Sequence, residues 1–422
     1  VALFGTSEFA LRLPSLVAGL AALPLFWLAA RRWLDRTALP VALGLFAVAG
    51  PLIRYASELK QYSWDVAVAL ALLLAASYAE RARRRTVALA LWAVAGAAAV
   101  WCSHAAVFVL AGAGTVLAAS HVRQRDWRRA AEVAAVAAVW VASFAPCYLL
   151  SLRTLSGDAV VKSWWSAAYM PLPPTSPSDV KWFLETFVAL FTHPLGLTLA
   201  GLGAVAFLAG LPGAFRRAPV TACMLLAPVA VALLASGLRL YPFTGRFLLF
   251  TAPLLLPFTA VGVDGLRALG GRAGLRALVI IALLLQPALE ALDDLVLPDT
   301  PEGVRPAVDY LAQHRQPRDA VYVYSWAGPA FRYYARRADA GLDDAVIGLS
   351  SRNDWAFYIE EIDALRDSGR VWFVFVPVAP ELGGGEDKFF RTYLNEHATP
   401  VDELQTKGSS LFLYEFGPSS RR

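Results

Sequence analysis

The chain has little charge, because only 17% of its 422 residues are Asp, Glu, Lys or Arg, whereas 57% are hydrophobic. Soluble domains are about one quarter charged and about half apolar, so this composition is typical of a membrane protein. Cysteine is scarce as well, and Cys102, Cys147 and Cys223 each lie in an apolar run without metal-ligand spacing. The sequence therefore predicts neither a disulfide framework nor a cysteine-based zinc site.

Lysine is also rare, with five residues against 33 arginines, and most of the arginines form short clusters between apolar runs. Such clusters are a signal of membrane topology and do not indicate nucleic-acid binding. A Gly-rich phosphate loop, a nucleophile elbow and an internal repeat are absent from the sequence. The chain begins at Val1 without the charged region or cleavage site of a signal peptide, and we expect that its amino-terminal part is missing.

Ten apolar stretches predict membrane-spanning helices, which need about 20 mainly apolar residues each. The fourth and fifth stretches are joined only by Cys102 to His104, and we predict a helical hairpin there. The predicted fold is a membrane all-α bundle over residues 1–292, followed by a small soluble α/β domain over residues 293–422. The stretches are Leu13–Ala30, Ala38–Ile53, Trp64–Tyr78, Val87–Trp101, Ala105–Ser120, Ala130–Leu150, Leu195–Leu211, Val220–Ala235, Phe247–Val263 and Ala277–Leu292.

The loops between these stretches alternate between the two sides of the membrane, and their basic residues are unequally divided. One set of loops carries 16 basic residues, among them Arg83, Arg84 and Arg85, whereas the other set carries 7. The richer side is cytoplasmic by the positive-inside rule. Residues 293–422 are therefore predicted to lie on the outer face.

Beyond Asp293, short β-rich runs alternate with amphipathic segments, which is typical of a small α/β unit. We predict strands at Ala320–Tyr324, Val371–Val376 and Leu411–Phe416, and helices at Gly328–Arg337 and Trp355–Asp367. The glycines at 383–385 predict a flexible turn before a further helix, because a phosphate cradle needs a different motif.

Polar residues concentrate between the second and third stretches, where Arg54 to Asp65 reads RYASELKQYSWD. Ionisable residues in or near a span are costly and usually face one another or a water-filled cavity. If one helix continued through this segment, Glu58, Gln61, Tyr62 and Asp65 would share a face, and Arg54 could pair with Glu58. An ordinary interfacial helix end with a surface ion pair explains the same pattern.

Three further residues on the predicted outer face are candidates for binding. Tyr241 and Arg246 precede a long apolar run, where a fork-shaped guanidinium suits a phosphate at the level of the lipid headgroups. The alternative for Arg246 is snorkelling to those headgroups. His104 lies at the turn of the hairpin, where a lone His is more often an interface residue than a catalyst.

The longest outer loop runs from Arg153 to Pro194 and is rich in Trp, Tyr and Pro. An aromatic belt at the membrane interface explains this composition. A loop of this length is also a candidate lid over a site, because long ordered loops tend to be functional.

Four stretches together resemble the polytopic glycosyltransferases of the GT-C class, in the family 39 branch of protein O-mannosyltransferases and bacterial aminoarabinose transferases. They are LFGTSEFALRLPSLVAGL at Leu3–Leu20, IRYASELKQYSWDV at Ile53–Val66, YPFTGRFLLFTAPLLL at Tyr241–Leu256 and, in the soluble part, the stretch Arg305–Arg337. The resemblance covers nearly the whole chain.

The resemblance implies a set of substrate- or phosphate-binding residues on the outer face. Its members are Glu58, Lys60, Gln61, Tyr62, His104, Tyr241 and Arg246. His104 departs from the family's commoner His-Tyr pair, because Ala105 follows it. Family members also use an Asp in a loop that would precede Val1, so no residue of this chain is assigned as catalytic, and we expect the chain as given to lack transferase activity.

The resemblance further implies transfer of a sugar from a polyprenyl-phosphate donor to a lipid, glycan or protein acceptor on the extracytoplasmic side of a bacterial inner membrane. The implied partners are this donor and membrane lipids, and the sugar and acceptor stay open. No cofactor is certain, although the family allows a divalent cation in the intact protein. A carrier or a noncatalytic subunit that handles a lipid-linked saccharide is the alternative, but a transporter would more often show repeats and helices broken near the bilayer midplane.

Overall fold

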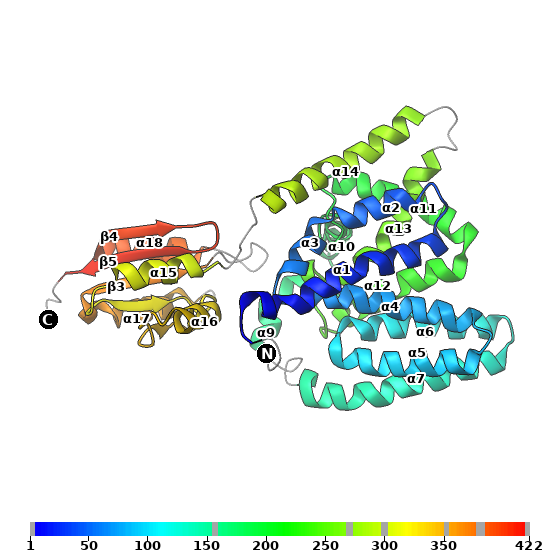
Figure 1. Cartoon of the computed structure of the whole chain (residues 1–422), viewed down its shortest axis with the longest axis horizontal. Helices are drawn as coiled ribbons and strands as arrows, with labels where there is room; N and C mark the ends of the chain where they lie inside the picture. Colours follow the sequence, from blue (N-terminus) through cyan, green and yellow to red (C-terminus); the bar gives the residue numbers. More distant parts are fainter. Residues whose placement is uncertain are drawn as a thin grey trace. The chain divides into compact units, whose positions relative to one another are not determined.

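The computed structural model describes residues 5–153, 159–266, 273–296, 303–349, 354–376 and 385–417. The chain divides into two units, Val1–Leu295 and Val296–Arg422, which are described separately below (Figure 1). The division predicted between residues 292 and 293 lies three residues before this point.

All regular secondary structure among the described residues of the first unit is helical. Its longer helices are α1 (Glu8–Trp33), α2 (Leu39–Ala47), α3 (Gly50–Ser57), α4 (Tyr62–Arg81), α5 (Arg85–Cys102), α6 (Ala105–Arg123), α7 (Trp127–Cys147), α10 (Pro177–Thr192), α11 (Ala200–Arg217), α12 (Pro219–Gly237), α13 (Ala252–Gly265) and α14 (Ala273–Val296). A π-helical segment η1 (Tyr148–Leu152), a short helix α9 (Ala159–Trp164) and the 3-10 turns η2 (Ser166–Ala168) and η3 (Gly245–Thr251) lie between them. Helices α4 to α7 lie side by side, with the break at Ser103 and His104 between α5 and α6 as predicted (Figure 1).

Eight helical segments among the described residues are long and apolar enough to cross a membrane, and α2 with α3 adds a ninth if that bent pair is one span. This agrees with the predicted membrane bundle of about ten helices. Helix α11 corresponds to the remaining predicted span, but its glycines and its final Arg216 and Arg217 make it less apolar than the others.

Two details differ from the sequence prediction. The stretch Ala38–Ile53 is not one straight helix, because α2 and α3 meet at 46° where Pro51 lacks the amide hydrogen that a continuous helix would use. The long outer segment from Arg153 to Pro194 is not a plain loop, because α9, η2 and α10 lie within it. A capping box between Ser176 and Asp179 begins α10.

Helices α11 and α13 approach each other very closely at two glycines. A Cβ atom added at Gly210 would collide with the carbonyl oxygen of Phe258, and one added at Gly262 would collide with the carbonyl oxygen of Ala206. Small residues let helix backbones pack tightly where lipid supplies no hydrophobic driving force. This crossing therefore depends on glycine at both positions.

We expect Gly210→Ala to lower stability, because the methyl group must push two helix backbones apart at a cost of about 1–3 kcal/mol. Gly201→Ala on the same helix is the matched control, since a Cβ there meets no atom within 4 Å. Thermal unfolding of both variants in detergent would measure the difference. Equal midpoints for the two variants would contradict the close crossing.

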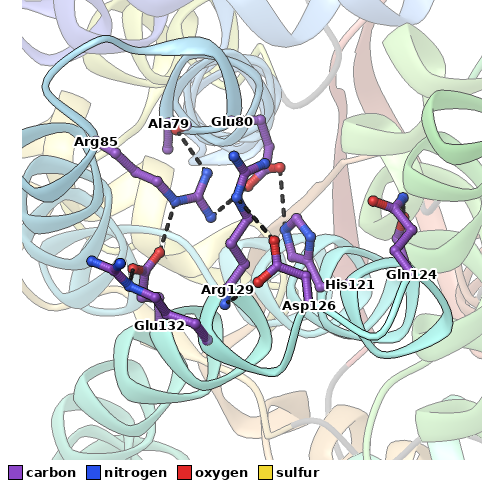
Figure 2. A network of polar contacts seen from close by, with 10 residues as sticks. Ala79, Glu80, Arg85, His121, Gln124, Asp126, Arg129 and Glu132 are labelled. Carbon is purple, nitrogen blue, oxygen red and sulfur yellow. Dashed lines mark hydrogen bonds and ion pairs between the residues drawn. The ribbon is translucent and has the colours of Figure 1, made fainter.

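A polar network joins those ends of helices α4 to α7 that are predicted to lie on the cytoplasmic side (Figure 2). The guanidinium of Arg85 on α5 contacts Glu80 of α4 at 3.2 Å and Glu132 of α7 at 2.7 Å. Glu80 also lies 3.2 Å from the buried ring of His121 on α6. Arg85 and Glu80 thus connect the ends of four helices, α4 to α7.

We expect Arg85→Leu to destabilise the bundle by about 1–3 kcal/mol, because Glu80 loses its arginine partner and Glu132 keeps only the exposed Arg128. Arg83→Leu removes an exposed arginine two residues earlier in the chain and serves as the control. The readout is again the unfolding midpoint. If both variants unfold at the same temperature, the network does not contribute to the stability of the bundle.

The second unit is the predicted α/β domain, with a five-stranded mixed sheet in the order β2-β1-β3-β5-β4. Its strands are β1 (Ala320–Val323), β2 (Val346–Ile347), β3 (Arg370–Phe375), β4 (Ala398–Gln405) and β5 (Ser410–Phe416), and its helices are α15 (Arg305–His314), α16 (Gly328–Ala338), α17 (Trp355–Asp363) and α18 (Glu386–His397). Strand β1 is parallel to β2 and β3, whereas β5 is antiparallel to β3 and β4.

The central strand β3 is buried on both faces, which explains its continuous apolar sequence. Trp372 and Val374 pack in one core with α15 and α16, while Phe373 and Phe375 pack in the other with α17 and α18. Strands β2 and β4 were not predicted from the sequence. Strand β2 has only two residues, and β4 is a largely exposed edge strand without an apolar run.

Candidate functional site

The polar segment between α3 and α4 is a break in the helix. Helix α3 ends at Ser57, Glu58 has an extended backbone, and α4 begins at Tyr62. The hydroxyl of Ser15 on α1 donates a hydrogen bond of 2.8 Å to the carbonyl of Lys60, which fastens the break to the bundle. Glu58 therefore does not share a helical face with Tyr62, as it would in a continuous helix.

Glu58 lies between two cations. Its carboxylate contacts Arg54 Nε at 2.8 Å, as the sequence predicts, and Lys60 Nζ at 3.3 Å. The side chain of Arg54 is 49% exposed, so this pair resembles surface ion pairs, which contribute about 0–1 kcal/mol. The break thus presents two positive charges around one carboxylate.

Arg246 lies among three aromatic rings, called here the Arg246 cluster. Its guanidinium carbon is 5.9 Å from the ring of Tyr62, 5.8 Å from Trp165 and 5.7 Å from Phe247. These distances are within the range of cation–π attraction. Its Nε is buried and has no hydrogen-bond partner among the described residues. The rings therefore hold the guanidinium of Arg246 in place, while its Nε–H donor has no acceptor among the described residues.

The rings of the Arg246 cluster come from three separate parts of the chain. Tyr62 begins α4 and stacks edge-on against Tyr55 of α3 at 5.1 Å, across the helix break. Phe247 belongs to η3 and lies 4.9 Å from Trp165 and 6.1 Å from Tyr62. The cluster thus joins the break, the long segment between Arg153 and Pro194, and the start of the last buried span.

The segment that carries Trp165 is held by hydrogen bonds within η2 and just after it. Trp182 of α10 donates to the carbonyl of Ala167 at 2.9 Å, and the amide of Phe243 donates to the carbonyl of Ala168 at 2.9 Å. The buried hydroxyl of Ser236 on α12 accepts from the amide of Met170 at 2.9 Å. This part of the long segment is therefore fixed over Arg246 in the structure.

Tyr241 contacts the same cluster through Phe247. Its hydroxyl donates to the carbonyl of Phe247 at 2.7 Å, and its ring packs against Phe108 of α6 at 4.7 Å. Burial raises the pKa of Tyr241 well above its usual value, so the phenol stays neutral and acts as a donor. Tyr241 therefore shapes the backbone next to Arg246.

Two predicted residues have no described contact with either the Arg246 cluster or the ion pairs of Glu58. Gln61 is exposed and precedes the first residue of α4, and His104 is exposed and precedes α6. The structure brings Tyr62, Tyr241 and Arg246 together, and places Glu58 and Lys60 at the adjoining break. Trp165 and Phe247 were not predicted, because a tryptophan in an aromatic loop and a phenylalanine in an apolar run also suit an interface belt or a span.

A carboxylate, Asp65, is buried within the first turn of α4. It is 4% exposed, and its Oδ1 accepts a hydrogen bond of 2.6 Å from Ser103 between α5 and α6. Among the described residues, no group of three or more His, Cys, Asp or Glu is placed to hold a metal ion. The site as described is a cation among aromatic rings, beside a charged helix break.

No protein-family model and no curated protein sequence matches this chain. Solved structures do match. ArnT from Cupriavidus metallidurans in the apo state is 16% identical, with 98% of this chain and 85% of that chain covered and a TM-score of 0.55. The same protein bound to undecaprenyl phosphate is 15% identical over the same shares, with a TM-score of 0.53. The oligosaccharyltransferase of Archaeoglobus fulgidus is 14% identical, with 86% of this chain and 56% of that chain covered and a TM-score of 0.48.

The chain has the fold of a polytopic GT-C glycosyltransferase. The aminoarabinose transferase ArnT shares this fold over nearly the whole of this chain, which confirms the resemblance expected from the sequence. The apolar helices and this fold together make the chain a multi-pass membrane protein. Likeness at this level of identity describes the fold, and the chemistry has to be argued from the site.

Proposed function

We propose that this protein transfers a sugar from a polyprenyl-phosphate-linked donor to a lipid, glycan or protein acceptor on the extracytoplasmic face of a bacterial inner membrane. The observation that carries the proposal is Arg246, a guanidinium held by three aromatic rings with a buried Nε that has no partner among the described residues. A buried donor without a partner costs about 1–3 kcal/mol, which an anionic ligand would recover.

A phosphate suits this position for two reasons. Guanidinium groups bind phosphate oxygens through parallel hydrogen bonds, and the aromatic rings keep the fork of Arg246 in one place. Lys60 lies in the adjoining helix break, 3.3 Å from Glu58, and we assign it as the second positive charge of the proposed phosphate site. The fold supports the same ligand class, because ArnT, which shares it, has been crystallised with undecaprenyl phosphate.

The reaction that follows is substitution at the anomeric carbon of the donor. The acceptor oxygen forms the new glycosidic bond, the bond to the carrier phosphate breaks, and the phosphate leaves with both electrons of that bond. Arg246 and Lys60 stabilise the negative charge that develops on the leaving phosphate, which is commonly the largest contribution to such catalysis. Tyr62 contacts the guanidinium of Arg246 and Glu58 lies in the adjoining helix break, while a base that takes the acceptor proton stays unassigned.

We expect Arg246→Ala to weaken binding of undecaprenyl phosphate by roughly 10- to 100-fold, since a charge-assisted hydrogen bond is worth about 1.5–3 kcal/mol. Arg246→Lys should restore binding only in part, because the fork is lost. The measurement is the Kd of the full chain in nanodiscs, titrated with undecaprenyl phosphate. Arg239→Ala, an exposed arginine in the same loop, is the control, and an unchanged Kd for Arg246→Ala would reduce Arg246 to a snorkelling anchor.

The proposal that the second unit lies on the extracytoplasmic side makes a separate prediction. In a variant without the three natural cysteines, Ser368→Cys in the second unit should react with an impermeant maleimide in intact cells, because the side chain is exposed and proposed to lie outside. Gln124→Cys, in the turn between α6 and α7, should react only after lysis. The opposite pattern would place the second unit in the cytoplasm and remove the extracytoplasmic reaction with it.

A further inference from the structure

The buried carboxylate of Asp65 has no place in the chemistry described above. It belongs to the first turn of α4, within a segment apolar enough to span a membrane, and is 4% exposed. Ionisable residues in spans are expensive and are usually retained for a function. Ser103 donates a hydrogen bond of 2.6 Å to Oδ1 of Asp65, and Ser103 is itself 2% exposed.

Ser103 lies at the junction of two helices. It occupies the two-residue break between α5 and α6, where its amide donates to the carbonyl of Ala99 at 2.9 Å. Its hydroxyl also accepts from the amide of Ala106 at 3.2 Å, in the first turn of α6. The bond from Ser103 to Asp65 therefore fastens the end of α5 and the start of α6 to the start of α4.

The two helices fastened here, α4 and α6, each carry an aromatic residue that contacts the Arg246 cluster or its neighbour Tyr241. On α4, Tyr62 precedes Asp65 by three residues, and its ring lies 5.9 Å from the guanidinium carbon of Arg246. On α6, Phe108 follows Ser103 by little more than one turn and packs against Tyr241, which bonds to the backbone of Phe247. A shift of α6 against α4 would change the space in which Arg246 is held.

We propose that Asp65, through its hydrogen bond with Ser103, is a positioning residue that keeps the Arg246 cluster at the geometry required to bind a carrier phosphate. This inference rests on the proposed function, because it names a residue that serves the same site. Asp65 acts here as a hydrogen-bond acceptor, and the bound phosphate touches Arg246. An amide oxygen can accept the same bond, which separates this role from one that requires the negative charge.

The test measures binding of undecaprenyl phosphate and of undecaprenol, which lacks the phosphate, to the full chain in nanodiscs. Asp65→Ala should reduce the preference for the phosphate by roughly 3- to 10-fold, as expected for one lost hydrogen bond, and Ser103→Ala, which also loses the bond from the amide of Ala106, should reduce it by at least as much. Asp65→Asn should stay within about 2-fold of the unsubstituted chain, because it keeps the acceptor. Binding of undecaprenol should be unchanged in all three variants.

Ser63→Ala is the matched control. Ser63 is a serine of the same helical turn that is 2% exposed, and its Oγ has no hydrogen-bond partner among the described residues. It should bind both lipids as the unsubstituted chain does. Thermal unfolding midpoints and elution profiles identify any variant that fails to fold, and if Asp65→Ala fails to fold, Ser103→Ala decides the result.

The outcomes separate the two proposals. If the unsubstituted chain shows no preference for undecaprenyl phosphate over undecaprenol, the proposed function fails and the role of Asp65 fails with it. If the unsubstituted chain shows the preference and folded Asp65→Ala keeps it, only the role of Asp65 is overturned. If Asp65→Asn loses as much preference as Asp65→Ala, the hydrogen-bond account is wrong.

Discussion

The structure depends on the fact that a bilayer core offers no water to polar side chains, so an ionisable side chain buried there is stabilised by a partner within the protein. Helix α4 shows this at both ends. At its first turn Asp65 bonds to Ser103, and at its last turn Glu80 lies between Arg85 and His121. Because these partners belong to α5, α6 or the turn between them, the polar residues also decide which helices surround α4.

The candidate site follows from this arrangement at the predicted outer end. The helix break before Tyr62 and the fixed segment around Trp165 meet at Arg246, and none of these parts is close to another in sequence. The aromatic rings exclude water from one side of the guanidinium without neutralising it. Electrostatic attraction is stronger in such surroundings than in bulk water, which is why an anion would bind there more tightly than to an exposed arginine.

The secondary structure was largely predictable, because its signals are local. Apolar runs located the spanning helices, and continuous or alternating apolar residues located β1, β3 and β5. The prediction was less accurate where the local signal is weak or ambiguous. The kink at Pro51 lies within an apolar run, α10 lies within a segment rich in proline and tryptophan, and β4 carries Pro400 and Asp402 on an exposed edge.

The sequence by itself determined that this chain is a membrane protein with an α/β domain, and it pointed to Tyr62, Tyr241 and Arg246 as residues of interest. Only the tertiary structure decided that these three lie together, that Trp165 covers them, and that Asp65 meets Ser103. The physical reason is that composition and periodicity report the preference of each segment for lipid or water. Contacts between residues 38 or more positions apart are set by how whole helices pack, and no local pattern records them.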